Sequence, residues 1–153
     1  MSESTSPLSP TALRSRALVL LSRREHTRSE LQTKLRELDG DADTIEAILN
    51  EFADKGWQSD QRFAEMFVRQ EIRKGHGPLN IRQSMKQRGI EASLIAGAIG
   101  TEDWFAHARA IRERRFGEEL PDDRKEQARQ LRFLQYRGFG GDHCRYAMRP
   151  TDD

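Results

Sequence analysis

Three short stretches of the chain share one form: FADKGW at 52–57, MKQRGI at 85–90 and LQYRGF at 134–139. Each begins with an apolar residue and ends in a glycine followed by another apolar residue. A helix that ends in a Schellman motif needs a positive φ just past its C-cap, and glycine adopts that conformation without steric cost. The residue after this glycine commonly packs against the residue five positions earlier. The stretches therefore predict three helix ends rather than ligand-binding glycines.

Helical periodicity extends over most of the remaining chain, and no segment alternates convincingly as a strand does. Thr27 and Asp43 are each followed three residues later by glutamate, which is the form of a capping box. Ser59 is a further candidate cap, and Pro78 suits the first position of a helix, where no amide donor is needed. The pattern predicts helices at 11–24, from 27, from about 43, from 59, from 78, and at 91–99, 102–115, 121–137 and 141–148.

The chain also repeats itself. A shift of about 50 residues places His26 on His76 and Leu35 on Met85, and a similar shift places Arg88-Gly89-Ile90 on 137–139. Repeats of this kind contact mainly their neighbours, so they build an extended protein. We expect an all-α fold, an elongated and curved stack of three tandem three-helix repeats. The expected boundaries are a disordered tail at 1–10, repeats at 11–56, 57–100 and 101–149, and a short tail at 150–153.

The composition suits a thin core and a large solvated surface, because 35% of the 153 residues are hydrophobic and 33% are charged. The single cysteine, Cys144, excludes an internal disulfide and fits a reducing compartment. No apolar run approaches the roughly 18 residues of a membrane span, and MSESTSPLSP at the start lacks the features of a signal peptide. We expect a cytoplasmic protein without a membrane partner.

The sequence offers no arrangement of residues that indicates a reaction. The four histidines, at 26, 76, 107 and 143, are not at metal-ligand spacing with one another or with Cys144. No base or orienting partner marks Cys144 as a nucleophile. We therefore expect no catalytic residue, no metal site and no cofactor.

Charge is distributed unevenly although the net charge is only +1. Residues 12–36 hold seven basic residues against two acidic ones, and 69–88 hold six against one, at equivalent positions of the first two repeats. Between them, 43–65 holds six acidic residues against two basic ones. Such runs are often only solvated surface, but stacked repeats could align them into a cationic stripe that binds phosphates or an acidic protein groove. The candidate binding residues are Arg23, Arg24, Arg28, Arg73, Lys74, Arg82, Lys86 and Arg88.

Trp57 and Trp104 each lie near the start of a repeat, beside apolar neighbours. Packing in the core or between repeats is the expected role for both, and base stacking is the alternative.

Several stretches resemble the RecX proteins, regulators of the RecA recombinase. They are 21–35 (LSRREHTRSELQTKL), 60–64 (DQRFA), 73–90 (RKGHGPLNIRQSMKQRGI) and 132–139 (RFLQYRGF), within a likeness that covers roughly 11–148. The resemblance implies tandem three-helix repeats and a protein that binds the RecA filament on single-stranded DNA. It further implies that the protein lies in the filament groove and restrains ATPase, strand-exchange and co-protease activities. We expect a monomer, with a dimer as the open alternative. The segment 140–146 departs from the family pattern, because its paired glycines weaken the expected final helix.

On this resemblance we expect a non-catalytic modulator, mainly an inhibitor, of RecA. Direct contacts to DNA phosphates are a further candidate interaction of its basic residues. The alternative is a sequence-specific DNA-binding regulator that uses a three-helix module as a helix-turn-helix reader. Such a reader would concentrate its base-contacting residues on one exposed helix, whereas here the basic positions repeat between modules.

Overall fold

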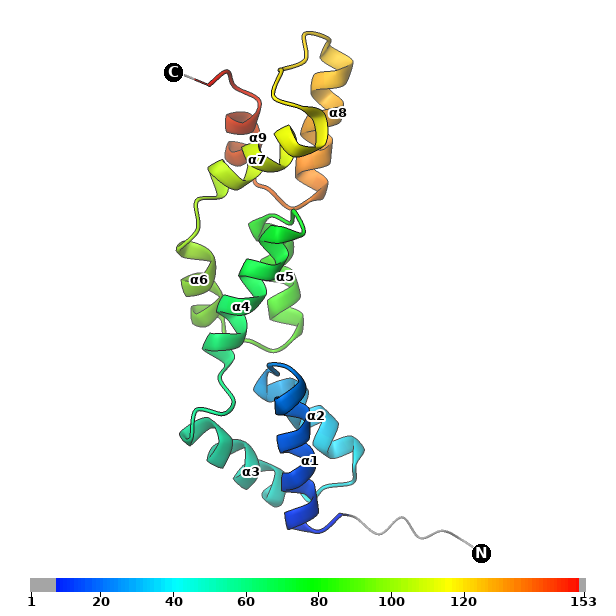
Figure 1. The fold of residues 1–153 in the computed structure, drawn as a ribbon, viewed down its shortest axis with the longest axis vertical. Helices are drawn as coiled ribbons and strands as arrows, with labels where there is room; N and C mark the ends of the chain where they lie inside the picture. Colours follow the sequence, from blue (N-terminus) through cyan, green and yellow to red (C-terminus); the bar gives the residue numbers. More distant parts are fainter. Residues whose placement is uncertain (1–7, 152–153) are drawn as a thin grey trace, which may run out of the picture.

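The computed structural model describes residues 8–151, and every regular element in that range is an α-helix. The described chain has nine helices. Figure 1 shows consecutive helices gathered into groups that follow one another along the long axis. Helices pack extensively only within each group. The predicted elongated, curved stack of three tandem three-helix repeats is confirmed. The helices are α1 (Pro10–Arg23), α2 (Arg28–Glu37), α3 (Ala42–Asp54), α4 (Asp60–Arg73), α5 (Pro78–Gln87), α6 (Ala92–Gly100), α7 (Trp104–Phe116), α8 (Arg124–Tyr136) and α9 (Gly141–Ala147).

The predicted glycine-ended helices are confirmed in detail. Gly56, Gly89 and Gly138 have positive φ values of 73°, 80° and 98°. The amide after each glycine donates to the carbonyl five positions earlier: Trp57 to Phe52 at 2.9 Å, Ile90 to Met85 at 3.2 Å, and Phe139 to Leu134 at 3.1 Å. α2 and α4 end in the same way, at Asp39 (φ 58°) and Gly75 (φ 88°), which the sequence pattern did not single out.

Side-chain caps begin several helices, and one predicted cap was wrong. Thr27 and Ser59 accept hydrogen bonds from the third residue after them, as predicted. The cap of α3 is Asp41 rather than Asp43, because Asp41 is extended and its carboxylate accepts from the Thr44 amide at 3.2 Å. Asp43 lies in the first turn instead, where its charge still favours the helix dipole.

The ends of the described chain adjust two further expectations. α1 begins at Pro10, one residue before the predicted start, and Ser9 caps it by accepting from the Ala12 amide at 3.1 Å. The remainder of the predicted tails, 1–7 and 152–153, lies outside the described residues. The segment that departs from the family pattern still forms α9, which packs against α7 and buries Cys144 and Ala147.

The hydrophobic core is divided unequally. α1–α3 enclose a cluster of their own, whereas the buried residues of α4–α9 form one continuous cluster. Trp104 belongs to that cluster, is only 7% exposed and donates its indole N–H to the Ile99 carbonyl at 2.9 Å. Trp57 packs on Phe52, with ring centroids 5.4 Å apart, but remains 41% exposed. The packing prediction is therefore confirmed for Trp104 and only partly for Trp57.

None of the helices within residues 8–151 has the length and apolar character needed to span a lipid bilayer.

Glu51 on α3 makes the stability of the first repeat sensitive to acid. Arg14 of α1 donates to both of its carboxylate oxygens, at 2.8 and 2.7 Å, and Lys55 donates at 2.8 Å. The hydrogen bonds from Arg14 and Lys55 lower the pKa of Glu51 to about 2. A lowered folded-state pKa stabilises the protein above the unfolded pKa, and this stabilisation is lost as pH falls toward the folded value.

We therefore expect Glu51→Gln to reduce the stability near neutral pH and to flatten the dependence of stability on pH between about 4.5 and about 2. Urea unfolding at a series of pH values measures this. An unchanged pH profile in the variant would contradict a role for the Glu51 pair. Asp54→Asn, at an exposed carboxylate on the same helix without an ion pair in the described structure, is the control.

Candidate partner-binding surface

Basic pairs end the first helix of every repeat. Arg23 and Arg73 are the last residues of α1 and α4, and Arg24 and Lys74 are the C-caps that follow. Cations at these positions complement the negative end of the helix dipole, which gives a local reason for their placement. In the third repeat the last turn of α7 carries the pair Arg114-Arg115, just before the helix ends at Phe116. The sequence comparison missed this pair because the third repeat matches the others only near its end.

The first joint, where repeat 1 meets repeat 2, is made of polar contacts. The Thr27 hydroxyl donates to the Arg88 carbonyl at 3.3 Å. The Arg28 amide donates to Asp60 at 2.8 Å. Gln58 donates to the carbonyl of the residue before Thr27, also at 3.3 Å. The loop between α1 and α2 is therefore docked on the start of α4 and the end of α5.

Three of the predicted binding residues are engaged in ion pairs around this joint. Glu30 accepts from Arg24 at 2.9 Å and from Arg88 at 3.1 Å, so it joins side chains from two repeats. The Arg88 guanidinium also lies 4.9 Å from the ring centroid of Phe67. Arg28 instead faces α3, where it pairs with Glu46 at 3.0 Å. The charge of these arginines is therefore partly neutralised within the protein.

The other predicted binding residues are less neutralised than these three arginines, so more of their positive charge is available to a partner. Arg23, Arg73, Arg82 and Lys86 are exposed and have no ion pair within the described part of the chain. Arg82 and Lys86 are one turn apart on α5 and so share a helix face. Lys74 is exposed and pairs with Glu71 at 3.3 Å. Because α5 runs from the second joint to the first, its cations connect the two joints (Figure 1).

The second joint, where repeat 2 meets repeat 3, uses equivalent segments but closer backbones. The Gly77 amide donates to the Arg137 carbonyl at 2.7 Å, and the Leu79 amide donates to the Gly138 carbonyl at 2.9 Å. A Cβ on Gly77 would lie 2.5 Å from the carbonyl carbon of Gly138, so this approach requires glycine. Beside this contact lies a cavity of about 250 Å³. Its lining residues are Lys74, Gly75, Ile111, Arg114, Arg115, Phe133 and Arg137.

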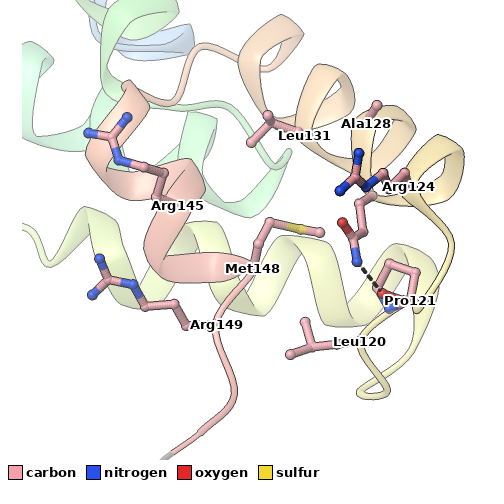
Figure 2. Close-up of a pocket in the computed structure, with 9 residues that line it drawn as sticks. Leu120, Pro121, Arg124, Ala128, Leu131, Arg145, Met148 and Arg149 are labelled. Carbon is pink, nitrogen blue, oxygen red and sulfur yellow. Dashed lines mark hydrogen bonds between the residues drawn. The ribbon is translucent and has the colours of Figure 1, made fainter.

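Repeat 3 carries a larger groove of about 790 Å³ (Figure 2). Met148 reaches from the end of α9 toward α8, between Leu120 and Leu131. The Gln127 amide donates to the Pro121 carbonyl at 2.9 Å and holds the α7–α8 loop against α8. The remaining lining residues are Ala128 and three arginines, Arg124, Arg145 and Arg149. An apolar surface with cations around it can accept an apolar side chain flanked by carboxylates.

The chemistry available to Cys144 is limited by its burial. Its thiol is fully buried and donates to the Phe139 carbonyl at 3.6 Å. Burial raises the pKa of the Cys144 thiol, which disfavours the reactive thiolate. Between residues 8 and 151, no three His, Cys, Asp or Glu side chains come together as a metal site. The expectation that the protein has no catalytic residue stays a prediction.

Comparison with known proteins finds the same architecture in one family. Three family models match in order: the first three-helix domain of RecX at residues 14–52, the second at 59–99 and the third at 101–148. A regulatory protein RecX of Halorhodospira halophila is 44% identical over 144 residues, covering 93% of this chain and 89% of that protein. The regulatory protein RecX of Acinetobacter baylyi is 40% identical over 139 residues, covering 91% and 87%.

Solved structures of RecX proteins have the same fold as this chain. RecX from Lactobacillus salivarius superposes with a TM-score of 0.80 over 90% of this chain and 93% of that one, at 24% identity, which supports the fold. A second crystal structure, of a regulatory protein RecX, has a TM-score of 0.74 at 27% identity, covering 88% of this chain and 70% of that one. The order of the three domains, the identities over nearly the whole length and the shared fold together show that this chain belongs to the RecX family.

Proposed function

We propose that the protein is a non-catalytic modulator, mainly an inhibitor, of RecA, and that it binds in the groove of the RecA filament on single-stranded DNA. Bound there, it restrains ATP hydrolysis, strand exchange and co-protease activity. The family supplies the expected partner. The observation that carries the proposal is the basic pair at the end of the first helix in all three repeats of an elongated stack.

A filament repeats the same surface at regular intervals, and a protein built of repeats can contact it at several points at once. Linked weak contacts gain affinity because each later contact forms at a high effective concentration. Contacts made largely by exposed cations are individually weak and depend on salt. A stack lying along the groove would also exclude the second DNA strand and protein substrates by its volume.

Reversing the free cations of repeat 2 tests the proposal. The variant with Arg73, Arg82 and Lys86 all changed to Glu should bind RecA filaments at least about tenfold more weakly, because like charges across an interface repel. Co-sedimentation with RecA on single-stranded DNA, with a RecA-free control, measures binding. Inhibition of RecA ATPase measures function, and circular dichroism checks the fold.

The matched control changes three exposed cations outside the two basic runs and without ion pairs in the described structure, Arg124, Lys125 and Arg132, to Glu. Both variants alter the net charge equally, so only a position-specific effect separates them. Undiminished inhibition by the folded repeat-2 variant would rule out this face as the binding surface. Strong, sequence-dependent binding to duplex DNA without RecA would instead favour the helix-turn-helix alternative.

A further inference from the structure

The two joints differ at one equivalent position. In the first joint, Arg24 and Arg88 share the single negative charge of Glu30. Fifty residues later the same position is Asn80, whose amide donates to the Tyr136 carbonyl at 3.0 Å. The repeat therefore keeps its cations at the second joint but replaces the shared carboxylate with a neutral amide.

The second joint holds uncompensated positive charge, because Arg114 and Arg115 add to it while only Glu71 pairs with a cation of the cavity. Lys74 and Arg137 are the equivalents of the two arginines that share Glu30, and Arg114 and Arg115 line the same cavity. Lys74 pairs with Glu71, and the three arginines have no ion pair among residues 8–151. Like charges gathered in a partly enclosed site repel one another, and a bound anion relieves that repulsion.

Two of these guanidinium groups, those of Arg115 and Arg137, are held in place before any ligand arrives. The Arg115 and Arg137 guanidinium carbons lie 5.6 and 5.1 Å from the ring centroid of Phe133. Phe116 in turn packs edge-on against Phe133, with centroids 5.2 Å apart. Arg137 also donates to the Lys74 carbonyl at 3.3 Å. Donors fixed in this way lose less entropy when they bind an anion.

An aromatic hollow of about 620 Å³ adjoins the cationic cavity and shares Phe133 and Arg137 with it. Tyr136, in this hollow, is 86% exposed, more than any other large hydrophobic side chain that the structure describes as exposed. An exposed aromatic ring beside guanidinium groups is the arrangement on which bases of single strands stack. The two hollows together offer one place for a phosphate and a neighbouring place for a base.

We propose that the second joint binds single-stranded DNA, with a phosphodiester in the cation-lined cavity and an adjacent base stacked on Tyr136. Duplex DNA fits less well, because its bases are stacked on one another and cannot reach the ring. The inference rests on the proposed function only in that a RecA filament supplies the single strand. It names which part of the protein contacts that strand directly.

Titration of the full chain with a fluorescein-labelled oligothymidylate, without RecA, tests this by fluorescence anisotropy at several salt concentrations. Asn80→Glu introduces the carboxylate that the first joint carries, and Arg114→Glu with Arg115→Glu removes cations that line the cavity. Each lost phosphate contact should lower the slope of log affinity against log salt by about 0.7. Thr33→Glu is the control for Asn80→Glu, because it adds one negative charge at an exposed position of α2. It should leave binding unchanged.

Tyr136→Ala separates stacking from charge. We expect it to weaken oligonucleotide binding by about 5- to 150-fold without changing the salt slope. If the cavity variants and Tyr136→Ala, all folded by circular dichroism, bind oligothymidylate as tightly as the parent chain, the proposal is wrong. It is also wrong if a polyglutamate peptide, and not the oligonucleotide, binds the parent chain and loses affinity in the arginine variant.

The same variants distinguish this inference from the proposed function. A protein that binds the oligonucleotide through this joint but does not co-sediment with RecA filaments supports the DNA site and contradicts the RecA proposal. A protein that inhibits RecA but does not bind the oligonucleotide supports the RecA proposal and contradicts the DNA site.

Discussion

Gly138→Ala is expected to lower the free energy of unfolding by about 2–5 kcal/mol. Gly138 has a φ of 98°, which costs an alanine roughly 1–2 kcal/mol. A Cβ there would also lie 2.7 Å from the backbone nitrogen of Asn80 in the neighbouring repeat. Relieving that overlap requires the two repeats to move apart, at a cost of about 1–3 kcal/mol. The second joint should therefore loosen as the protein is destabilised.

Urea unfolding of Gly138→Ala and Gly56→Ala provides the comparison. Gly56 has a similar positive φ of 73°, but a Cβ on it would meet nothing within 4 Å. Its substitution should cost only the conformational part, roughly 1–2 kcal/mol. Equal losses in the two variants would mean that the close approach of repeats 2 and 3 contributes nothing to stability.

Arg112→Ala is the second substitution with a large expected effect, about 3–5 kcal/mol. The Arg112 side chain lies inside repeat 3 and is only 1% exposed. Its Nε donates to the Ala147 carbonyl at 2.7 Å, and its Nη groups donate to the carbonyls of Gly117 at 3.3 Å and Glu118 at 3.4 Å. It thereby ties α7 to the end of α9 and to the α7–α8 loop. Truncation leaves these carbonyls without their donor.

Arg109→Ala is the matched control, because Arg109 also donates to carbonyls near the end of α9, those of Tyr146 and Arg149, but is only half-buried. Its loss should cost nearer to 1 kcal/mol. Hydrogen exchange should show the additional loss of Arg112→Ala concentrated in α9 and the α7–α8 loop. A variant as stable as Arg109→Ala would show that Arg112 does not hold these segments together.

Local rules account for what the sequence predicted well. A Schellman end, a serine cap or an initial proline depends on residues within one turn, so the phrases around Gly56, Gly89 and Gly138 were sufficient. The wrong cap at Asp43 shows the limit of such rules. Asp41 and Asp43 both fit a cap, and the geometry after Gly40 decided between them.

The candidate binding face was harder to predict, because it depends on contacts between repeats as well as on local rules. The positions of Arg23 and Arg73 at equivalent helix ends follow from the repeat. The repeat does not predict which of these cations pair with a carboxylate. Glu30 and Arg88 are 58 residues apart and meet only because two repeats dock on each other. The cavity at the second joint was missed because its arginines, such as Arg115, come from the repeat with the weakest similarity.

By itself, the sequence determined the helices, their ends and their grouping into three repeats, since capping and periodicity act over a few residues. Tertiary structure decided how the repeats join: a polar contact between the first two, and a continuous core between the second and third. It also decided where positive charge is left uncompensated. These features depend on side chains that lie far apart in the sequence and meet only across a repeat boundary. Patterns within one helical turn do not predict such contacts.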